Sequence, residues 1–299
     1  MCPGGQYLRG VNADGSIVCE GFDLPPIITT VDNPVNLVGG PNSIAIGLDG
    51  FPVISYYDST ASALKVAKCV NAECSGAATI TGVDDPVTNS VGTYNSIAIG
   101  LDGFPVISYF DQTAGNLKVA KCVNAACTGA STITTADTAA NSVGWYSSIA
   151  ISQDGFPIIS YYDSSAQSLK VAKCLNAACT GFPTVTVVDT SANVGQYTSI
   201  AIGLDGLPVI SYHDSTAGSL KVAKCVNAAC TGTSTVTVVD DPPVNVVGRH
   251  SSLKVGLDGF PVIAYFDLNN SAVKVAKCVN AACTGTSTIT NVDDQPTEL

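Results

Sequence analysis

Residues 43–74 carry the sequence SIAIGLDGFPVISYYDSTASALKVAKCVNAEC, and residues 96–127 repeat it as SIAIGLDGFPVISYFDQTAGNLKVAKCVNAAC. Five units of this kind follow one another along the chain. Their anchor serines are Ser43, Ser96, Ser148, Ser199 and Ser252. A fixed period of about 52 residues indicates a repeat architecture, in which every unit is one small supersecondary element that packs on its neighbours.

Each unit predicts four antiparallel strands, which we call A to D. In the first unit, strand A covers 43–48 and ends at Asp49-Gly50, a dipeptide typical of two-residue hairpin turns. Strands B and C cover 52–58 and 64–69, and strand D follows the paired cysteines, as at 184–188. Repeated four-stranded meanders are typical of a β-propeller. We therefore predict an all-β propeller of five four-stranded blades with strand A innermost.

The first residues do not fit the repeat. We predict that residues 1–26 form a separate hairpin closed by Cys2 and Cys19, and that the propeller covers residues 27–299. Residues 27–32, IITTVD, match strand D although no strand A precedes them. This surplus strand either helps to close the ring beside the last blade or belongs to a reduced sixth blade formed by the head.

The cysteines predict disulfides and an oxidising compartment. Ten of the twelve form pairs with the spacing C-x4-C, one pair in each repeat: Cys69/Cys74, Cys122/Cys127, Cys174/Cys179, Cys225/Cys230 and Cys278/Cys283. A zinc site needs cysteines that converge in one place, whereas pairs one repeat apart are spread out in space. Disulfides are therefore the favoured interpretation, and they place the protein outside the cell or at its surface.

Charge and hydropathy exclude two classes of partner. The chain has 24 acidic and 13 basic residues, a net charge of −11, which argues against a nucleic-acid binder. No apolar run approaches the ~20 residues that a membrane-spanning helix needs, so membrane insertion is not expected.

The residues around the start of strand A differ between repeats and supply the candidate ligand site. In an up-and-down meander, the D–A and B–C loops lie at one end of the ring, and binding usually resides on such loops. The candidate ligand-binding residues are Tyr94, Trp145, Tyr146, Tyr197, Arg249 and His250. Their rings could stack on sugars, or could instead fill gaps between blades; the sequence leaves both interpretations open.

One aspartate recurs at every B–C turn and is the candidate metal ligand. These residues are Asp58, Asp111, Asp163, Asp214 and Asp267. A ring of carboxylates at the channel mouth could hold Ca²⁺, the only cofactor the sequence suggests. An aspartate that caps its own turn explains the repetition better. For the ten lysines that recur on strand C, we expect pairing with the repeated aspartates, or side chains that extend from strand C to the solvent, rather than an anion-binding ring.

The sequence does not indicate an enzyme. The dipeptides His213-Asp214 and His250-Ser251 have residue types suited to a triad, but both histidines occupy positions held by aromatic residues in other repeats. A glycosidase needs two carboxylates in different environments, and nothing singles out such a pair. We therefore predict no catalytic residues.

The tandem pattern DGFPVISYYD…LKVAKC…AAC resembles repeat units of secreted bacterial proteins. In plan, the chain is similar to the five-bladed tachylectin-type lectins, and this similarity implies sugar binding. The favoured hypothesis is a non-enzymatic extracellular binding propeller, carbohydrate-recognising or adhesive, whose partner is a glycan or a surface protein. The alternative is a structural or assembly module of a bacterial surface appendage or filament, and a hydrolase is the third hypothesis.

Overall fold

The computed structural model describes residues 6–11, 17–21, 28–32, 37–138 and 142–293. The chain divides into two units, Met1–Thr30 and Val31–Leu299. In the first unit, β1 (Gln6–Val11) pairs antiparallel with β2 (Ile17–Gly21). The side chains of Cys2 and Cys19 lie outside the described part of the chain, so the disulfide expected there stays a prediction.

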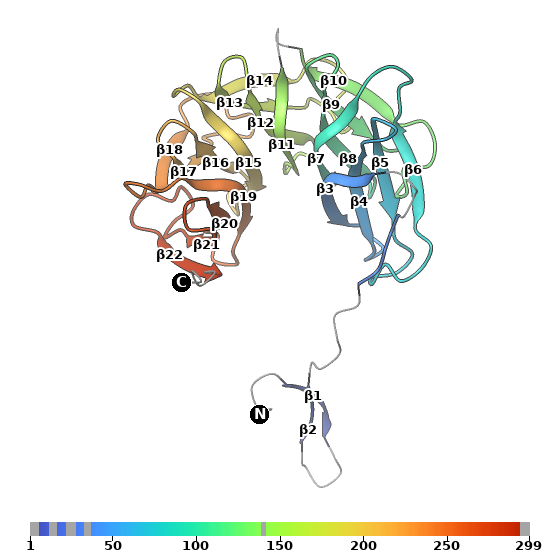
Figure 1. Ribbon diagram of the computed structural model, residues 1–299, viewed down its shortest axis with the longest axis horizontal. Helices are drawn as coiled ribbons and strands as arrows, with labels where there is room; N and C mark the ends of the chain where they lie inside the picture. Colours follow the sequence, from blue (N-terminus) through green and yellow to red (C-terminus); the bar gives the residue numbers. More distant parts are fainter. Residues whose placement is uncertain (1–5, 12–16, 22–27, 33–36, 139–141, 294–299) are drawn as a thin grey trace. The chain divides into compact units, whose positions relative to one another are not determined.

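The second unit is built from five four-stranded antiparallel sheets, the blades of a β-propeller (Figure 1). The blades follow one another along the chain, as the repeats predicted. Blade 1 contains β3 (Val38–Ile46), β4 (Pro52–Asp58), β5 (Ala63–Lys68) and β6 (Thr79–Asp84). Blade 2 contains β7 (Val91–Ile99), β8 (Pro105–Asp111), β9 (Asn116–Lys121) and β10 (Thr132–Asp137).

The remaining three blades keep the same order. Blade 3 contains β11 (Val143–Ile151), β12 (Pro157–Asp163), β13 (Ser168–Lys173) and β14 (Thr184–Asp189). Blade 4 contains β15 (Val194–Ile202), β16 (Pro208–Asp214), β17 (Ser219–Lys224) and β18 (Thr235–Asp240). Blade 5 contains β19 (Val247–Val255), β20 (Pro261–Asp267), β21 (Ala272–Lys277) and β22 (Thr288–Asp293). Among the described residues, no helix has the length and apolarity needed to cross a bilayer.

One end of every blade is closed by a turn and a disulfide. In blade 3, Asp154 Oδ1 accepts the backbone amide of Phe156 at 2.9 Å and the Lys173 ammonium at 3.0 Å. Because Lys173 directly precedes Cys174, this contact ties the A–B turn to the cysteine loop. All five predicted C-x4-C pairs form disulfides, which confirms that interpretation and indicates an oxidising compartment. The bonds join Cys69 to Cys74, Cys122 to Cys127, Cys174 to Cys179, Cys225 to Cys230, and Cys278 to Cys283.

The cysteine loops differ from the sequence-based expectation in two details. The first cysteine follows strand C instead of ending it, because each strand C ends at the preceding lysine. The second cysteine adopts a left-handed backbone conformation that the sequence did not predict. Its φ lies between +51° and +55° in Cys74, Cys127, Cys179, Cys230 and Cys283. Such a φ is uncommon for a residue with a Cβ, and a turn supports it, as where the amide of Cys179 donates to Asn176 O at 3.1 Å.

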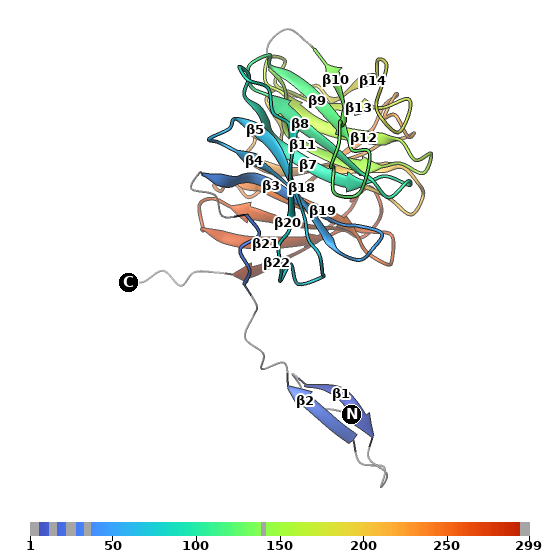
Figure 2. The same cartoon turned by 90° about the vertical axis from the view of Figure 1, so that its right-hand side faces the viewer.

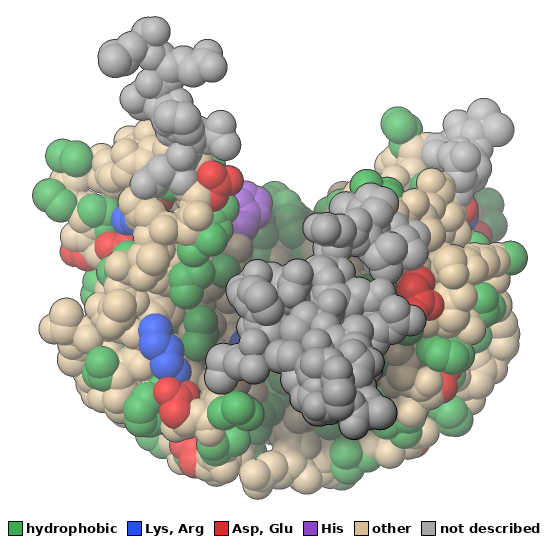
Figure 3. Space-filling model, turned by 90° about the horizontal axis from the view of Figure 1, so that it is seen from below, with side chains coloured by type: hydrophobic (Ala, Val, Ile, Leu, Met, Phe, Trp, Pro, Cys, Tyr) green, Lys and Arg blue, Asp and Glu red, His purple; other side chains and the backbone are tan. Residues whose placement is uncertain are grey.

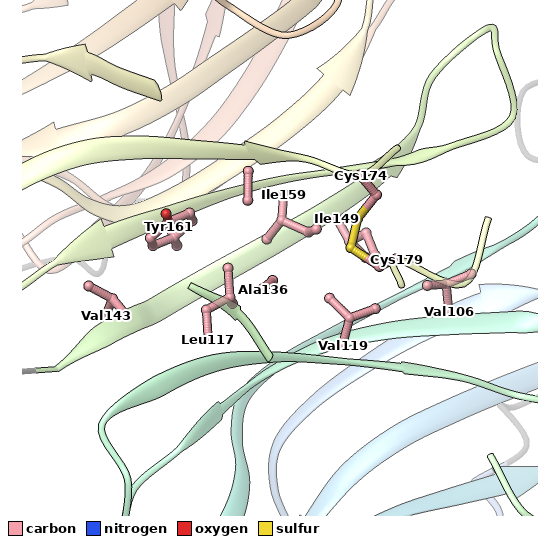
Figure 4. Packing of buried hydrophobic residues seen from close by; sticks show 11 residues of the cluster. Val106, Leu117, Val119, Ala136, Val143, Ile149, Ile159, Tyr161, Cys174 and Cys179 are labelled. Carbon is pink, nitrogen blue, oxygen red and sulfur yellow. A yellow bond between two sulfur atoms is a disulfide. The ribbon is translucent and has the colours of Figure 1, made fainter. Parts of the chain in front are cut away.

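The core lies between blades, where the face of one sheet packs on the face of the next (Figure 2). Between blades 2 and 3, Leu117 and Val119 of β9 face Ile149, Ile159 and Tyr161 of blade 3 (Figure 4). Branched and aromatic side chains of both blades form one buried cluster at this interface. The same contacts recur at the other interfaces because the sequence repeats.

Polar contacts also cross each of the four interfaces between successive blades. The hydroxyl of a strand-B tyrosine donates to the aspartate at the end of strand D in the preceding blade, as from Tyr161 to Asp137 at 2.6 Å. The hydroxyl of an anchor serine accepts an inner-strand amide of the next blade, as at Ser96 from Ile149 at 3.2 Å. These bonds fix the register between sheets that share no backbone ladder.

The ring of blades is open between blade 5 and blade 1 (Figure 1). In the described part of the chain, the inner strands pack in the series β3, β7, β11, β15 and β19, and no buried cluster joins β19 to β3. Residues 28–32 are not a strand, although the sequence predicted one, because no strand C lies beside them. The described head residues pair only with each other and do not form a sixth blade.

Three of the aspartates at the B–C turns, Asp58, Asp163 and Asp267, have a lowered pKa and give the fold a defined response to acid. Burial alone would raise the pKa of Asp163, but the Lys170 ammonium at 2.7 Å and the amides of Ser165 and Ala166 outweigh it and hold this pKa below its usual value. The folded state therefore binds fewer protons than the unfolded state near pH 4.

We expect the free energy of unfolding to be level at neutral pH and to fall as the pH drops below about 4, where the unfolded carboxylates take up protons first. Thermal melts between pH 7 and pH 2.5 measure this. Asp163→Asn should give a shallower acid slope than the unmodified chain. An equal slope in both proteins would contradict the assignment.

Candidate functional site

The predicted aromatic residues lie in the inner strands and not in loops, because each inner strand begins about five residues earlier than the repeat suggested. A β-bulge makes this extension possible. In blade 3, Gly144 has φ +107° and Tyr146 has φ +56°, and the pairing with β12 shifts on both sides of Trp145. A Cβ on Gly144 would lie 2.9 Å from Leu117 Cα of blade 2, so only glycine fits.

The bulges bring four rings from successive blades into one row, which we call the aromatic arc: Tyr94, Tyr146, Tyr197 and His250. The centroids of neighbouring rings are 4.7, 4.4 and 4.4 Å apart along the row. The arc does not continue onto blade 1, where Pro41 takes the corresponding position. Sequence reasoning thus found all four members, but it did not show that they touch.

The arc borders a hollow at one end of the inner strands. Its volume is about 280 Å³, and the residue that follows each ring completes its lining: Asn95, Ser147, Thr198 and Ser251. Aromatic faces beside hydroxyl and amide groups can hold a ligand that has both apolar and polar surfaces. Carbohydrates have both.

Trp145 and Arg249 lie in a second row behind the arc. Trp145 stacks on Tyr94 with centroids 5.4 Å apart and planes at 23°, and its Nε1 donates to Ser142 Oγ at 2.7 Å. Arg249 is half-buried opposite Phe266, and its Nε has no hydrogen-bond partner among the described residues. The structure therefore gathers five of the six predicted residues into contacting rings and places Arg249 next to His250.

Burial shifts the pKa of two ring-bearing residues in this region, Tyr146 and His213. Burial raises the pKa of Tyr146, and the neighbouring hydroxyls of Tyr197 and Tyr94 raise it further. Burial also lowers the pKa of His213, whose Nδ1 lies 2.7 Å from the carbonyl oxygen of Val247. His213 occupies a buried strand-B position, as Tyr162 does in blade 3, which agrees with its interpretation as an aromatic replacement.

The five aspartates that were candidate metal ligands form contacts within their own turns and blades. Each of the five aspartates at the B–C turns accepts a backbone amide of that turn and pairs with a lysine of its own blade. In the part of the chain that the structure describes, no three His, Cys, Asp or Glu side chains gather as a metal site requires. The ten strand-C lysines are likewise paired with aspartates, as expected.

The inner strands also line two cavities near the propeller axis, whose lining residues the sequence did not single out. Below the arc, the five anchor serines border a cavity of about 440 Å³, and the Ile and Ala residues that follow border another of about 450 Å³. Lys254 of β19 lines both cavities and replaces the alanine of the other blades. The sequence could have identified Lys254, because it is the one lysine of the chain outside the ten strand-C positions.

The comparisons with known proteins identify the fold. No family model matches the sequence, and no curated protein matches it significantly. Among solved structures, the chain is similar to an α-L-arabinofuranosidase from Lactobacillus brevis, with a TM-score of 0.51, 11% identity, and coverage of 85% of this chain and 91% of that chain. It is also similar to the Hadza microbial sialidase Hz136, with a TM-score of 0.55, 9% identity, and coverage of 86% and 59%.

A third similar structure is a bifunctional GH43-CE protein from Bacteroides eggerthii, with a TM-score of 0.51 and 14% identity over 85% of this chain and 35% of that one. At such identities, the likeness concerns the fold alone. The chain has the architecture of a five-bladed β-propeller, as the repeats predicted.

Proposed function

We propose that the protein is a non-enzymatic, secreted or cell-surface binding propeller of bacterial origin that recognises carbohydrate through the aromatic arc. The observation that carries the proposal is the arc itself. Four rings from four blades form a row in which the centroids of neighbouring rings lie within 4.7 Å of each other, and hydroxyl and amide groups border the same hollow. The resemblance in plan to tachylectin-type lectins agrees with this function.

The composition of the hollow favours binding over hydrolysis. Among the described residues that line it there is no Asp or Glu, whereas glycoside hydrolysis ordinarily uses two carboxylates across the scissile bond. The nearby aspartates are committed to turns and lysines. A protein partner that presents a glycan on its surface would satisfy the same site.

Tyr146→Ala is expected to weaken glycan binding by about tenfold or more, because Tyr146 contacts both Tyr94 and Tyr197 at the centre of the arc. A glycan array of the oxidised protein, with and without Ca²⁺, followed by titration of each hit, measures this. His250→Ala tests the exposed end of the arc, where truncation should leave packing intact.

Phe182→Ala is the matched control. Phe182 is 93% exposed and lies between strands C and D, at the end of the blade away from the arc. This variant should bind as the unmodified chain does. A blank array in both conditions, or equal losses in all three variants, would contradict the proposal and favour the structural or assembly role.

A further inference from the structure

The two blades that border the opening expose surfaces that are buried at every other interface. On β3, Ile44 is 60% exposed, whereas Ile97, Ile149 and Ile200 at the same repeat position are each 6% exposed. On β21, Val273 is 42% exposed, whereas the four strand-C leucines at its position are fully buried: Leu64, Leu117, Leu169 and Leu220. Blade 1 and blade 5 therefore each present half of an inter-blade interface.

The disulfides show the same difference. In blades 2 to 5 the disulfide belongs to the buried cluster that the blade shares with the preceding one, and its second cysteine is buried: Cys127, Cys179, Cys230 and Cys283. Blade 1 has no preceding blade among the described residues, and Cys74 is only half-buried. The disulfide of blade 1 thus extends the uncovered face that Ile44 begins.

The view toward the open side shows a hollow between these two blades, with hydrophobic side chains along the left wall, over blade 5 (Figure 3). On the face of blade 1, Ile54 and Tyr56 contribute to a cavity of about 200 Å³. Monomeric proteins rarely expose a contiguous apolar surface of this kind. The uncovered faces of blade 1 and blade 5 therefore indicate a place where something else packs.

Blades 1 and 5 also carry the polar groups that form hydrogen bonds between blades at the other interfaces. Asp293 at the end of β22 and the Ser252 hydroxyl have no bond to a following blade among the described residues, whereas Asp137 and Ser96 each have one. On the other side, Asp32 already accepts the hydroxyl of Tyr56 at 2.6 Å, as a strand-D aspartate of a preceding blade would.

Asp32 ends the segment IITTVD, which has the sequence of a strand D. Asp32 thus takes the position that the last residue of a preceding strand D would hold, and strands A, B and C of such a blade are lacking in the described chain. Stacking of a second copy through its own blade 1 would not meet this need, because the Asp32 of that copy already occupies the position that Asp293 would take.

We propose that the opening binds one further copy of the repeat, presented by a partner polypeptide as strands A, B and C, and that residues 28–32 add to this partner as its fourth strand. The partner's strand-B tyrosine would donate to Asp293, and its strand A would pack on Val273. A strand-A amide of the partner would donate to the Ser252 hydroxyl. The anchor serine of the partner would accept the amide of Ile44. Each contact repeats one that is observed at the four existing interfaces.

The test uses the full chain and a probe with the sequence of residues 194–224, which includes β15 to β17 and no cysteine, fused to a soluble carrier. We expect saturable one-to-one binding by fluorescence anisotropy, and new hydrogen-exchange protection of residues 28–32. A probe that carries Tyr212→Phe should bind several-fold more weakly, because it cannot donate to Asp293.

Val273→Asp in the full chain should weaken binding of the probe by about tenfold or more, because it places a charge in an apolar interface. Val187→Asp is the matched control, since Val187 is also a β-strand valine, 43% exposed, but lies on the outer strand of blade 3. A lack of binding would overturn the proposal. So would binding without protection of residues 28–32, or dimerisation of the chain through Val273 in sedimentation.

Discussion

Reduction of the five blade disulfides is expected to lower the free energy of unfolding by about 10 kcal/mol. Each disulfide joins cysteines five residues apart, and closing a loop of that size contributes about 2 kcal/mol through the entropy of the unfolded chain. The five loops lie in separate blades, so their contributions should add. Because the stability of a domain is about 5–15 kcal/mol in total, this loss removes most of it, and the reduced protein should melt at a far lower temperature than the oxidised one.

Chemical denaturation with and without reductant measures this effect. The double variant Cys174→Ala with Cys179→Ala isolates one blade and should cost about 2 kcal/mol. Its loop keeps a second set of restraints, because the Asn176 side chain donates to Thr180 O at 2.8 Å and accepts the amide of Thr180. A reduced protein with an unchanged melting temperature would show that these asparagine contacts suffice.

Leu169→Ala should lower the free energy of unfolding by about 2–5 kcal/mol, because truncation of a fully buried leucine leaves a cavity between blades 3 and 4. Val273→Ala at the same repeat position of blade 5 should cost less than about 1 kcal/mol, since that side chain is already 42% exposed. Urea denaturation of both variants measures the difference. Equal costs would mean that blade 5 is covered in solution.

Much of the fold follows from the sequence because the repeats are nearly identical. Asp49-Gly50 and its equivalents mark the hairpin turns, and the C-x4-C pairs mark the disulfide loops, so strand order and blade number could be predicted. The turn itself is longer than the two residues predicted, because strand A ends at Ile46 and strand B begins at Pro52. These features are local, and local turn chemistry decides them.

The bulges and the opening could not be predicted in this way. Tyrosine at a positive φ, as in Tyr146, is uncommon and is held there by packing of Gly144 against Leu117 of the preceding blade. Ring closure depends likewise on interfaces and not on any one repeat: Ile44 and Ile97 share the same sequence neighbours, SIAI, but differ tenfold in exposure. The candidate residues were therefore found by type, whereas their contacts required the structure.

The open series of blades has a consequence for how the molecule unfolds. In the described part of the chain, blade 3 packs on a neighbouring blade on both sides, whereas blades 1 and 5 each pack on a neighbouring blade on one side only. Such an array behaves as a one-dimensional chain of coupled units, whose ends fray before the middle opens. A closed ring has no ends, so anything that bridges blades 1 and 5 would convert stepwise fraying into a single cooperative transition.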